Sequence, residues 1–188
     1  MAKCVGVLAL QGGVREHADM LRGLGCEVTL VKKASQLDEI DGIVLPGGES
    51  STMDRILRRF DMRDQLAEKL QEGLPVLGTC AGLIMLAHHL EDPAPGQETL
   101  DVLDIDVRRN AFGPQRDSAV ERIETTFGVV EAAFIRAPEV VRVGESIEVI
   151  ARVDGRVVGV SAPTALGISF HPELTGDSTI HEQFLALV

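Results

Sequence analysis

The sequence predicts an α/β protein of three layers: a doubly wound, mostly parallel central sheet, flanking helices and a β-rich second half. Three observations lead to this fold class. In the first half, short and nearly continuous apolar runs alternate with helical patterns, as in a parallel sheet covered on both faces. Glycine-rich turns follow several of these runs. The second half has shorter β-prone runs that glycine or asparagine interrupts.

The length and the cysteines indicate one domain that folds without cross-links. A chain of 188 residues predicts a single domain over residues 1–188. A domain of this size buries about 70% of the surface that its unfolded chain exposes. The three cysteines, Cys4, Cys26 and Cys80, are odd in number, widely spaced and without the spacing of metal ligands. We therefore expect a cytoplasmic protein without disulfides and without a metal site.

Apolar runs in the first half predict the strands of the parallel sheet. Met1-Ala2-Lys3 precedes the first run, but no signal-peptide cleavage site follows, so we interpret this run as a buried strand. Continuous apolar runs of this kind are typical of strands buried on both faces. The strands are predicted at Cys4–Leu10, Glu27–Val31, Gly42–Leu45 and Pro75–Thr79.

Helical periodicity predicts helices between and after these strands. In the first helix, Val14, Ala18, Leu21 and Leu24 lie on one face and form its buried side. Ser50 is expected to cap the second helix, because a serine hydroxyl accepts a backbone N–H at a helix start. The helices are predicted at Val14–Leu24, Ser50–Arg59, Met62–Glu72 and Ala81–His89.

The second half predicts a loop, a hairpin, a late strand and a closing helix. Residues 91–98 are polar and contain proline and glycine, which predicts the loop. Asp154-Gly155 between two apolar runs predicts the β-hairpin. The hairpin strands are expected at Val149–Val153 and Arg156–Val160, the late strand at Ala165–Phe170 and the helix at Asp177–Val188.

Charge and composition exclude several classes of partner. Lys and Arg number 18 against 29 Asp and Glu, and the resulting net charge of −11 is opposite in sign to a duplex-binding surface. With six phenylalanines and neither tryptophan nor tyrosine, the chain lacks the aromatic platform that stacks single-stranded bases. No apolar run reaches the roughly 18 residues of a membrane span. We therefore expect neither nucleic acid nor a membrane as partner.

Cys80 lies in Gly78-Thr79-Cys80-Ala81-Gly82, which has the pattern of a strand-to-helix turn that presents a nucleophile. In such a turn the N–H of the next residue, Ala81, points toward the attacked carbonyl. The positive end of the following helix favours the thiolate. The pattern therefore makes Cys80 a candidate nucleophile, and the alternative is a buried structural cysteine in a parallel strand.

His171-Pro172-Glu173 follows an apolar strand and offers a base with a group to orient it. Residues two apart on an extended chain point to the same side, so the imidazole and the carboxylate are expected to meet. A thiol nucleophile needs this combination of base and orienting group. For His171 alone, the alternative is an ordinary surface histidine.

Pro46-Gly47-Gly48-Glu49-Ser50 follows the third predicted strand and contains adjacent glycines. Because glycine has no Cβ, backbone N–H groups in such a loop approach a ligand closely. The loop is therefore a candidate source of an oxyanion-hole donor beside the Ala81 N–H. The alternative is a plain glycine-rich turn, and a phosphate-binding loop is disfavoured because no G-K-[ST] follows.

The proline-glycine-glycine loop, the cysteine turn and the late His-x-Glu, in that order, resemble class I glutamine amidotransferases. Further segments narrow the resemblance to the glutaminase subunits of pyridoxal 5′-phosphate synthases, nearly from end to end. The segments that carry it are Leu8–His17, Leu45–Ser50, Gly78–Leu83, Arg109-Asn110-Ala111-Phe112-Gly113, Phe134–Pro138 and Ser169–Thr175.

The resemblance implies hydrolysis of L-glutamine to glutamate and ammonia by a triad of Cys80, His171 and Glu173. It implies an oxyanion hole at Ala81 and Gly48, and no metal or organic cofactor. The ammonia is expected to pass to a synthase subunit that makes pyridoxal 5′-phosphate and activates the glutaminase on docking. The same resemblance implies a glutamine site at Gly47, Gly48, Glu49, Arg109, Ile135 and Arg136. For both arginines the alternative is a solvated surface charge.

Three other functions remain open at this point. The chain fits a glutaminase that serves a different synthase, or an inactive regulatory subunit with the same fold. A stress-response cysteine protein with a similar doubly wound topology is the third, although the His-Pro-Glu segment does not belong to that pattern. The segment Gln11–His17 is expected at the same sheet edge, either in contact with the partner or as a plain turn.

Overall fold

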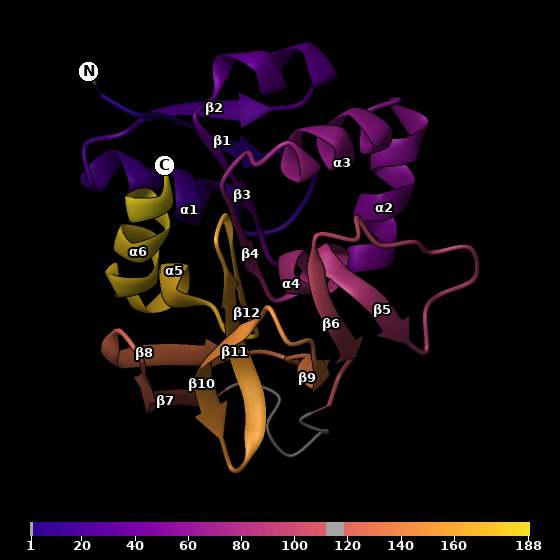
Figure 1. The fold of residues 1–188 in the computed structure, drawn as a ribbon. Coiled ribbons are helices and arrows are strands. Elements are labelled where there is room, and N and C mark those ends of the chain that lie inside the picture. The colour runs from indigo at the N-terminus through magenta and orange to yellow at the C-terminus, as the bar shows by residue number, and fades with distance from the viewer. Residues whose placement is uncertain (1, 112–118) are drawn as a thin grey trace.

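The computed structural model describes residues 2–111 and 119–188 and confirms the predicted α/β class (Figure 1). Its central layer contains five parallel strands in the order β2-β1-β3-β4-β12. The late strand, β12, pairs with β4 and thereby joins the second half of the chain to the first. The bounds are Cys4–Leu8 for β1, Glu27–Val31 for β2, Gly42–Leu45 for β3, Val76–Thr79 for β4 and Ala165–Ile168 for β12.

Helices cover both faces of this parallel sheet and make three layers. Residues of α1 and α6 share one apolar cluster with Val5, Val7 and Leu77 of the strands. Residues of α2, α3 and α4 share the other cluster with Ile43 and Leu45. Successive strand residues thus face opposite helix layers, which explains their continuous hydrophobicity. The helices span Val14–Gly23 (α1), Ser50–Arg59 (α2), Arg63–Gln71 (α3), Ala81–Leu86 (α4) and Thr179–Leu187 (α6).

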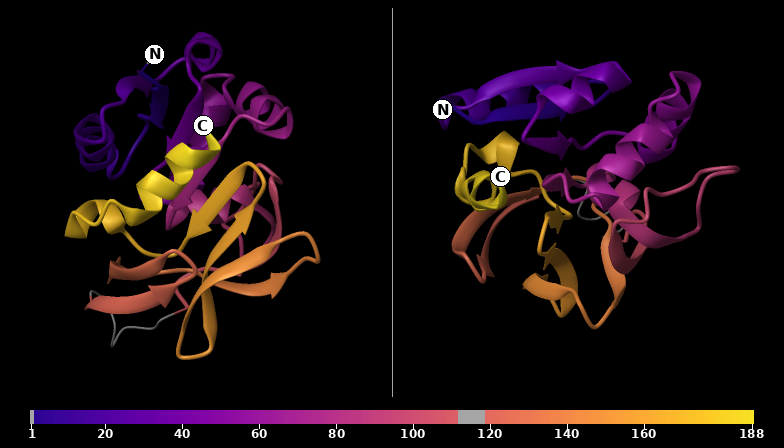
Figure 2. Two further views of the ribbon diagram at one scale, coloured as in Figure 1. Left: turned by 60° about the vertical axis from the view of Figure 1, so that its left-hand side comes forward. Right: turned by 45° about the horizontal axis from the view of Figure 1, so that its top comes forward.

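The remaining strands of the second half extend the sheet beyond β12, at the end opposite β2 (Figure 2). The predicted hairpin is confirmed, because β10 and β11 pair antiparallel around the turn at Asp154-Gly155. A second antiparallel pair, β7 with β8, follows β10. The strands span Leu103–Arg108 (β6), Ala119–Thr125 (β7), Gly128–Phe134 (β8), Glu139–Val143 (β9), Glu148–Val153 (β10) and Arg156–Ala162 (β11).

Three predicted details are wrong. The helix predicted at Ala81–His89 ends at Leu86, and residues 87–91 form strand β5 (Ala87–Glu91). This segment pairs in parallel with β6, a tertiary partner that its own sequence does not reveal. Leu24 lies beyond the last residue of α1, and the fully buried His17 occupies the core face instead. Glu49, not Ser50, caps α2 with its side chain.

Two short helices complete the described fold. A 3₁₀ helix, η1, spans Ala34–Glu39 between β2 and β3. Helix α5 spans Pro172–Thr175, and His171 directly precedes it. Proline at the first helical position lacks an N–H that would have no partner there, which explains why a helix begins here. No helix among the described residues is both long and apolar enough to cross a membrane.

The packing between the start of α4 and the end of β3 requires glycine at position 82. A Cβ added to Gly82 would lie 2.0 Å from the carbonyl oxygen of Leu45, which is backbone and has little room to move. We expect Gly82→Ala to lower the free energy of unfolding by about 1–3 kcal/mol, the usual cost of overpacking. Urea unfolding measures this loss.

Gly23→Ala is the matched control, because nothing lies within 4 Å of a Cβ at the end of α1. Alanine favours a helix over glycine, so this variant is expected to be at least as stable as the wild type. Equal stability of the two variants would contradict the packing argument.

Candidate functional site

A pocket of about 540 Å³ lies at the carboxyl ends of the parallel strands, where ligands of open α/β sheets bind. Turns after β1, β3, β4 and β12 all contribute to it. The structure brings together there every residue that the sequence singled out for the site, except Ala81. Those residues are Gly47, Gly48, Glu49, Cys80, Arg109, Ile135, Arg136, His171 and Glu173.

Cys80 forms the turn between β4 and α4 in a strained backbone conformation. Its φ is 50° and its ψ is −101°, a region that non-glycine residues rarely adopt. The Cys80 N–H donates to the carbonyl oxygen of Ile168 at 2.8 Å, which holds the turn on β12. Its thiol is nearly buried and lies 3.9 Å from the carbonyl oxygen of Ile135. The predicted strand-to-helix turn is therefore present, with the sulfur facing the pocket.

The imidazole of His171 and the carboxylate of Glu173 meet, although not through extended chain. Nδ1 of His171 lies 2.7 Å from Oε1 of Glu173. Glu173 belongs to α5, so a helical turn rather than strand alternation brings the two side chains together. The imidazole also packs on Gly47, where a Cβ would lie 2.3 Å from its Cε1 atom. Glycine at position 47 is thus required by the position of this ring.

The environment of His171 favours its charged form. Burial by itself lowers the pKa of this imidazole, but hydrogen bonds to Cys80 and Glu173 and their negative charges raise it to about 10. A protonated imidazole beside the thiol has two effects. It stabilises a thiolate, and it holds a proton that a leaving group can take.

Glu49 ties the glycine loop to the start of α2. Its carboxylate accepts hydrogen bonds from the N–H groups of Ser51 and Thr52 and from the Ser51 hydroxyl. Burial opposes its ionisation, but these hydrogen bonds dominate and lower the pKa of Glu49 to about 2. The Glu49 N–H in turn donates to Oε1 of Gln11 at 3.1 Å. A fixed negative charge therefore lies at the pocket wall.

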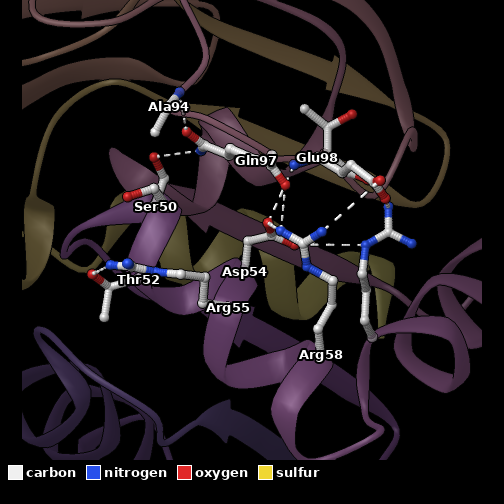
Figure 3. Close-up of polar contacts among 12 residues, drawn as sticks. Ser50, Thr52, Asp54, Arg55, Arg58, Ala94, Gln97 and Glu98 are labelled. Carbon is white, nitrogen blue, oxygen red and sulfur yellow. Dashed lines mark hydrogen bonds and ion pairs between the residues drawn. The ribbon is translucent and has the colours of Figure 1, made fainter.

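Arg109 reaches the same wall and contacts Glu49 and Gln97 among the described residues. Its guanidinium lies 3.3 Å from Oε1 of Glu49 and donates to Oε1 of Gln97 at 3.2 Å. The amide nitrogen of Gln97 donates to the Ser50 hydroxyl at 3.0 Å (Figure 3). Gln97 therefore links the arginine to the beginning of α2.

The loop that carries Gln97 is fastened to α2 by a second set of charges (Figure 3). The buried Asp54 accepts a hydrogen bond from the Glu98 N–H at 3.2 Å and pairs with Arg58 one turn further along α2. Arg63 at the start of α3 lies 3.2 Å from the Glu98 carboxylate. These contacts fix the loop, and through Gln97 they fix Arg109.

Ile135 and Arg136 also line the pocket. Arg136 has a φ of 44°, so its backbone lies in the left-handed region at the pocket edge. Its side chain is exposed, as the alternative of a solvated charge predicted. Phe112 and Gly113, which belonged to one of the resembling segments, lie outside the described residues.

Sequence reasoning missed several residues at or behind the pocket. Gln11, Glu16 and Asn110 line it, and Gln97 supports Arg109 from a loop that looked featureless. His17 was grouped with a segment expected to contact a partner, but its side chain is fully buried behind Glu173. The available signal for His17 was a polar residue within the apolar face of a helix.

The chain matches a known family over nearly its whole length. The sequence profile of the SNO glutamine amidotransferase family matches residues 7–188. The chain belongs to this family. Its fold agrees, because a crystal structure described as a glutamine amidotransferase superposes with a TM-score of 0.92 at 43% identity, covering 97% of both chains.

Sequence relatives of the chain carry a more specific name. The protein called pyridoxal 5′-phosphate synthase subunit PdxT from Corynebacterium glutamicum (strain R) is 50% identical over 190 residues, or 98% of the chain and 95% of the relative. The protein of the same name from Nocardioides sp. (strain ATCC BAA-499 / JS614) is 48% identical over 194 residues, or 100% and 96%. The similarity to these two relatives therefore extends over nearly the whole length of each chain.

The raised pKa of His171 predicts how the free energy of unfolding varies with pH. The pKa is about 10 in the folded protein and near 6.5 for an unperturbed histidine. Below about pH 6.5 both states hold the proton and the stabilisation is fully present. Between about pH 6.5 and 10 only the folded state retains the proton on His171, so the stability that this proton contributes is lost as pH rises.

We expect His171→Gln to lack this loss. In urea unfolding, the stability advantage of the wild type over the variant is expected to shrink steadily from pH 6.5 to 10. An advantage that stays constant over this range would contradict the raised pKa.

Proposed function

We propose that this chain hydrolyses L-glutamine to L-glutamate and ammonia, and that it supplies the ammonia to a synthase subunit for pyridoxal 5′-phosphate biosynthesis. One observation carries the chemistry: a thiol from the turn after β4 and an imidazole and a carboxylate from the segment after β12 meet in one pocket. The glutamine amidotransferase family supports the substrate, and relatives named as synthase subunits support the pathway.

In the proposed first step, the Cys80 thiolate attacks the side-chain carbonyl carbon of glutamine. The negative charge that develops on the carbonyl oxygen is accepted by the backbone N–H groups of Ala81 and Gly48. One such donor typically contributes about 10²–10³ in rate. The strained turn at Cys80 supports this assignment, because in turns of this kind the N–H of the residue after the nucleophile points toward the attacked carbonyl.

In the second step, the carbon–nitrogen bond breaks. The His171 imidazolium gives its proton to the leaving nitrogen, ammonia departs and a thioester joins Cys80 to the glutamyl group. Water then loses a proton to His171 and attacks the thioester, which releases glutamate and restores the thiolate. Glu173 holds the imidazole through its 2.7 Å contact with Nδ1 during both proton transfers.

The glutamine site is proposed at Gly47, Gly48, Glu49, Arg109, Ile135 and Arg136. An arginine suits the α-carboxylate of the substrate, because a guanidinium forms paired charge-assisted hydrogen bonds with it. Arg109 is the better candidate of the two, since Gln97 and Glu49 hold its guanidinium at the pocket wall. The ionised Glu49 is suited to the α-ammonium group.

The same proposal places the reaction in a single glutamine amidotransferase domain in the cytoplasm. The three free cysteines are consistent with a reducing compartment. L-Glutamine and the synthase subunit are the proposed partners, and neither nucleic acid, a membrane nor a cofactor is part of the mechanism.

Turnover of glutamine is expected to depend on Cys80 and on the synthase subunit. Glutamate release from L-glutamine by the purified chain is expected to rise strongly when the synthase subunit is added. Cys80→Ala is expected to abolish it, because deletion of a covalent nucleophile typically costs on the order of 10⁶ in rate. A coupled glutamate assay measures both effects.

Cys26→Ala is the matched control, since this thiol lies outside the pocket and is not expected to affect turnover. Glutamate release that survives Cys80→Ala would refute the mechanism. Full activity without stimulation would retain the glutaminase and point to a different acceptor of ammonia.

Binding of glutamine is expected to depend on Arg109. Removing a charge-assisted partner of the substrate carboxylate weakens the binding of substrate and transition state equally. Arg109→Ala is therefore expected to raise KM by roughly 10–100-fold with kcat little changed. Arg152→Ala is the control, because that guanidinium contacts the carbonyl of Gly155 on the distant hairpin. An unchanged KM in Arg109→Ala would move the carboxylate contact to another residue.

A further inference from the structure

Behind the pocket, four side chains from four different elements form a buried polar cluster. His17 comes from α1, Thr79 from β4, Glu173 from α5 and His181 from α6. His17, Thr79 and His181 are fully buried, and the Glu173 side chain is 1% exposed. The mechanism proposed above uses only Glu173 of these four. A buried polar group is costly unless it has partners, so the other three need an explanation.

His17 is the centre of this cluster. Its Nε2 atom lies 3.1 Å from the Thr79 hydroxyl and 3.5 Å from Oε1 of Glu173. Its Nδ1 atom lies 2.9 Å from Nε2 of His181. The Glu173 oxygen that faces His17 is the same one that contacts Nδ1 of His171. One carboxylate oxygen thus lies between the two imidazoles.

Two independent features fix which nitrogen of His17 carries the proton. First, Nε2 faces a carboxylate oxygen, which attracts an N–H and repels a lone pair. Second, Nδ1 of His181 is buried and has no hydrogen-bond partner among the residues that the structure describes. An orphaned acceptor costs less than an orphaned donor, so His181 carries its proton on Nε2 and donates it to Nδ1 of His17. Both features leave His17 with its proton on Nε2.

The two histidines act as neutral donors. Burial lowers the pKa of His17 well below its ordinary value, and the nearby His181 and His171 lower it further. Burial also lowers the pKa of His181 to about 4, with Asp177 opposing this shift. The one cationic ring beside Glu173 is therefore His171, while His17 orients the carboxylate without neutralising its charge.

We propose that His17 is a positioning residue for the triad: its Nε2–H, which lies 3.1 Å from the Thr79 hydroxyl and 3.5 Å from Oε1 of Glu173, attracts the Glu173 carboxylate and limits its rotation beside His171, and His181 fixes the proton on that nitrogen. Without this donor, Glu173 keeps its bond to His171 but has more freedom to rotate. The imidazole then spends less time in the orientation that both proton transfers need. This inference rests on the proposed function, since it assigns a role within that triad.

Two amide variants test the proposal because they imitate different ends of the imidazole ring. The amide nitrogen of Gln reaches the position of Nε2 and presents an N–H to Thr79 and Glu173, whereas the amide of Asn reaches only the position of Nδ1. In the complex with the synthase, His17→Asn is expected to lower kcat roughly tenfold, because the electrostatic attraction between the Nε2–H and the carboxylate is lost. KM for glutamine is expected to stay constant. His17→Gln is expected to remain within about twofold of the wild type.

Leu21→Ala provides the matched structural control. This fully buried leucine lies one turn after His17 on α1, and its truncation weakens the same helix without changing any contact to Glu173. It is expected to lower Tm and leave kcat unchanged. Equal kcat values for His17→Gln and His17→Asn would overturn the proposal, and so would a fall in kcat for Leu21→Ala that matches His17→Asn.

A second readout separates this inference from the proposed function. Alkylation of Cys80 by iodoacetamide, followed on its peptide by mass spectrometry, needs no glutamine. It is expected to be slower in His17→Asn than in His17→Gln, because the imidazolium that accompanies the thiolate is less well held. If the wild-type complex releases no glutamate, the proposed function fails, and equal alkylation rates in both variants overturn the role of His17.

Discussion

The site depends on the close approach between the start of α4 and the backbone of β3. Gly82 lies so near the Leu45 carbonyl that a Cβ would reach within 2.0 Å of it, and a Cβ on Gly78 would lie 2.7 Å from the Gly82 backbone. This contact lets the chain turn sharply from strand to helix, with Cys80 at positive φ. The sulfur is thereby carried to the carboxyl edge of the sheet, where the other loops converge. The fold therefore sets the reactive geometry through steric exclusion of side chains.

Around Cys80, hydrogen bonds between loops hold the pocket side chains that no helix or strand positions. Gln11 accepts from the Glu49 N–H, Glu49 caps α2, and Gln97 connects Arg109 to the same helix start. The Gln11–Glu49 and Gln97–Arg109 contacts join separate segments of the chain. Together they hold polar groups at the pocket wall before a ligand arrives, which reduces the cost of ordering them on binding.

The same logic extends behind the triad. Glu173 is shared between His171 at the pocket and His17 in the core, and burial keeps the second ring neutral while the first is protonated. Of the two histidines that contact this carboxylate, His17 is thus neutral and His171 is positively charged. The difference arises from their surroundings, because only His171 faces the thiol.

The sequence by itself determined the α/β class, the parallel strands and the hairpin, because apolar runs and glycine turns are local signals. Its motifs also marked Cys80, His171 and the glycine loop, whereas the other predicted pocket residues came from the family resemblance. Ordered motifs also pointed to glutamine amidotransferases. Tertiary structure alone decided that residues 87–91 form a strand, since β6 supplies their hydrogen bonds from a distant segment. It also decided that Gln97 supports Arg109 and that His17 reaches Glu173. Such contacts join residues distant along the chain, and no local pattern encodes a partner's position in space.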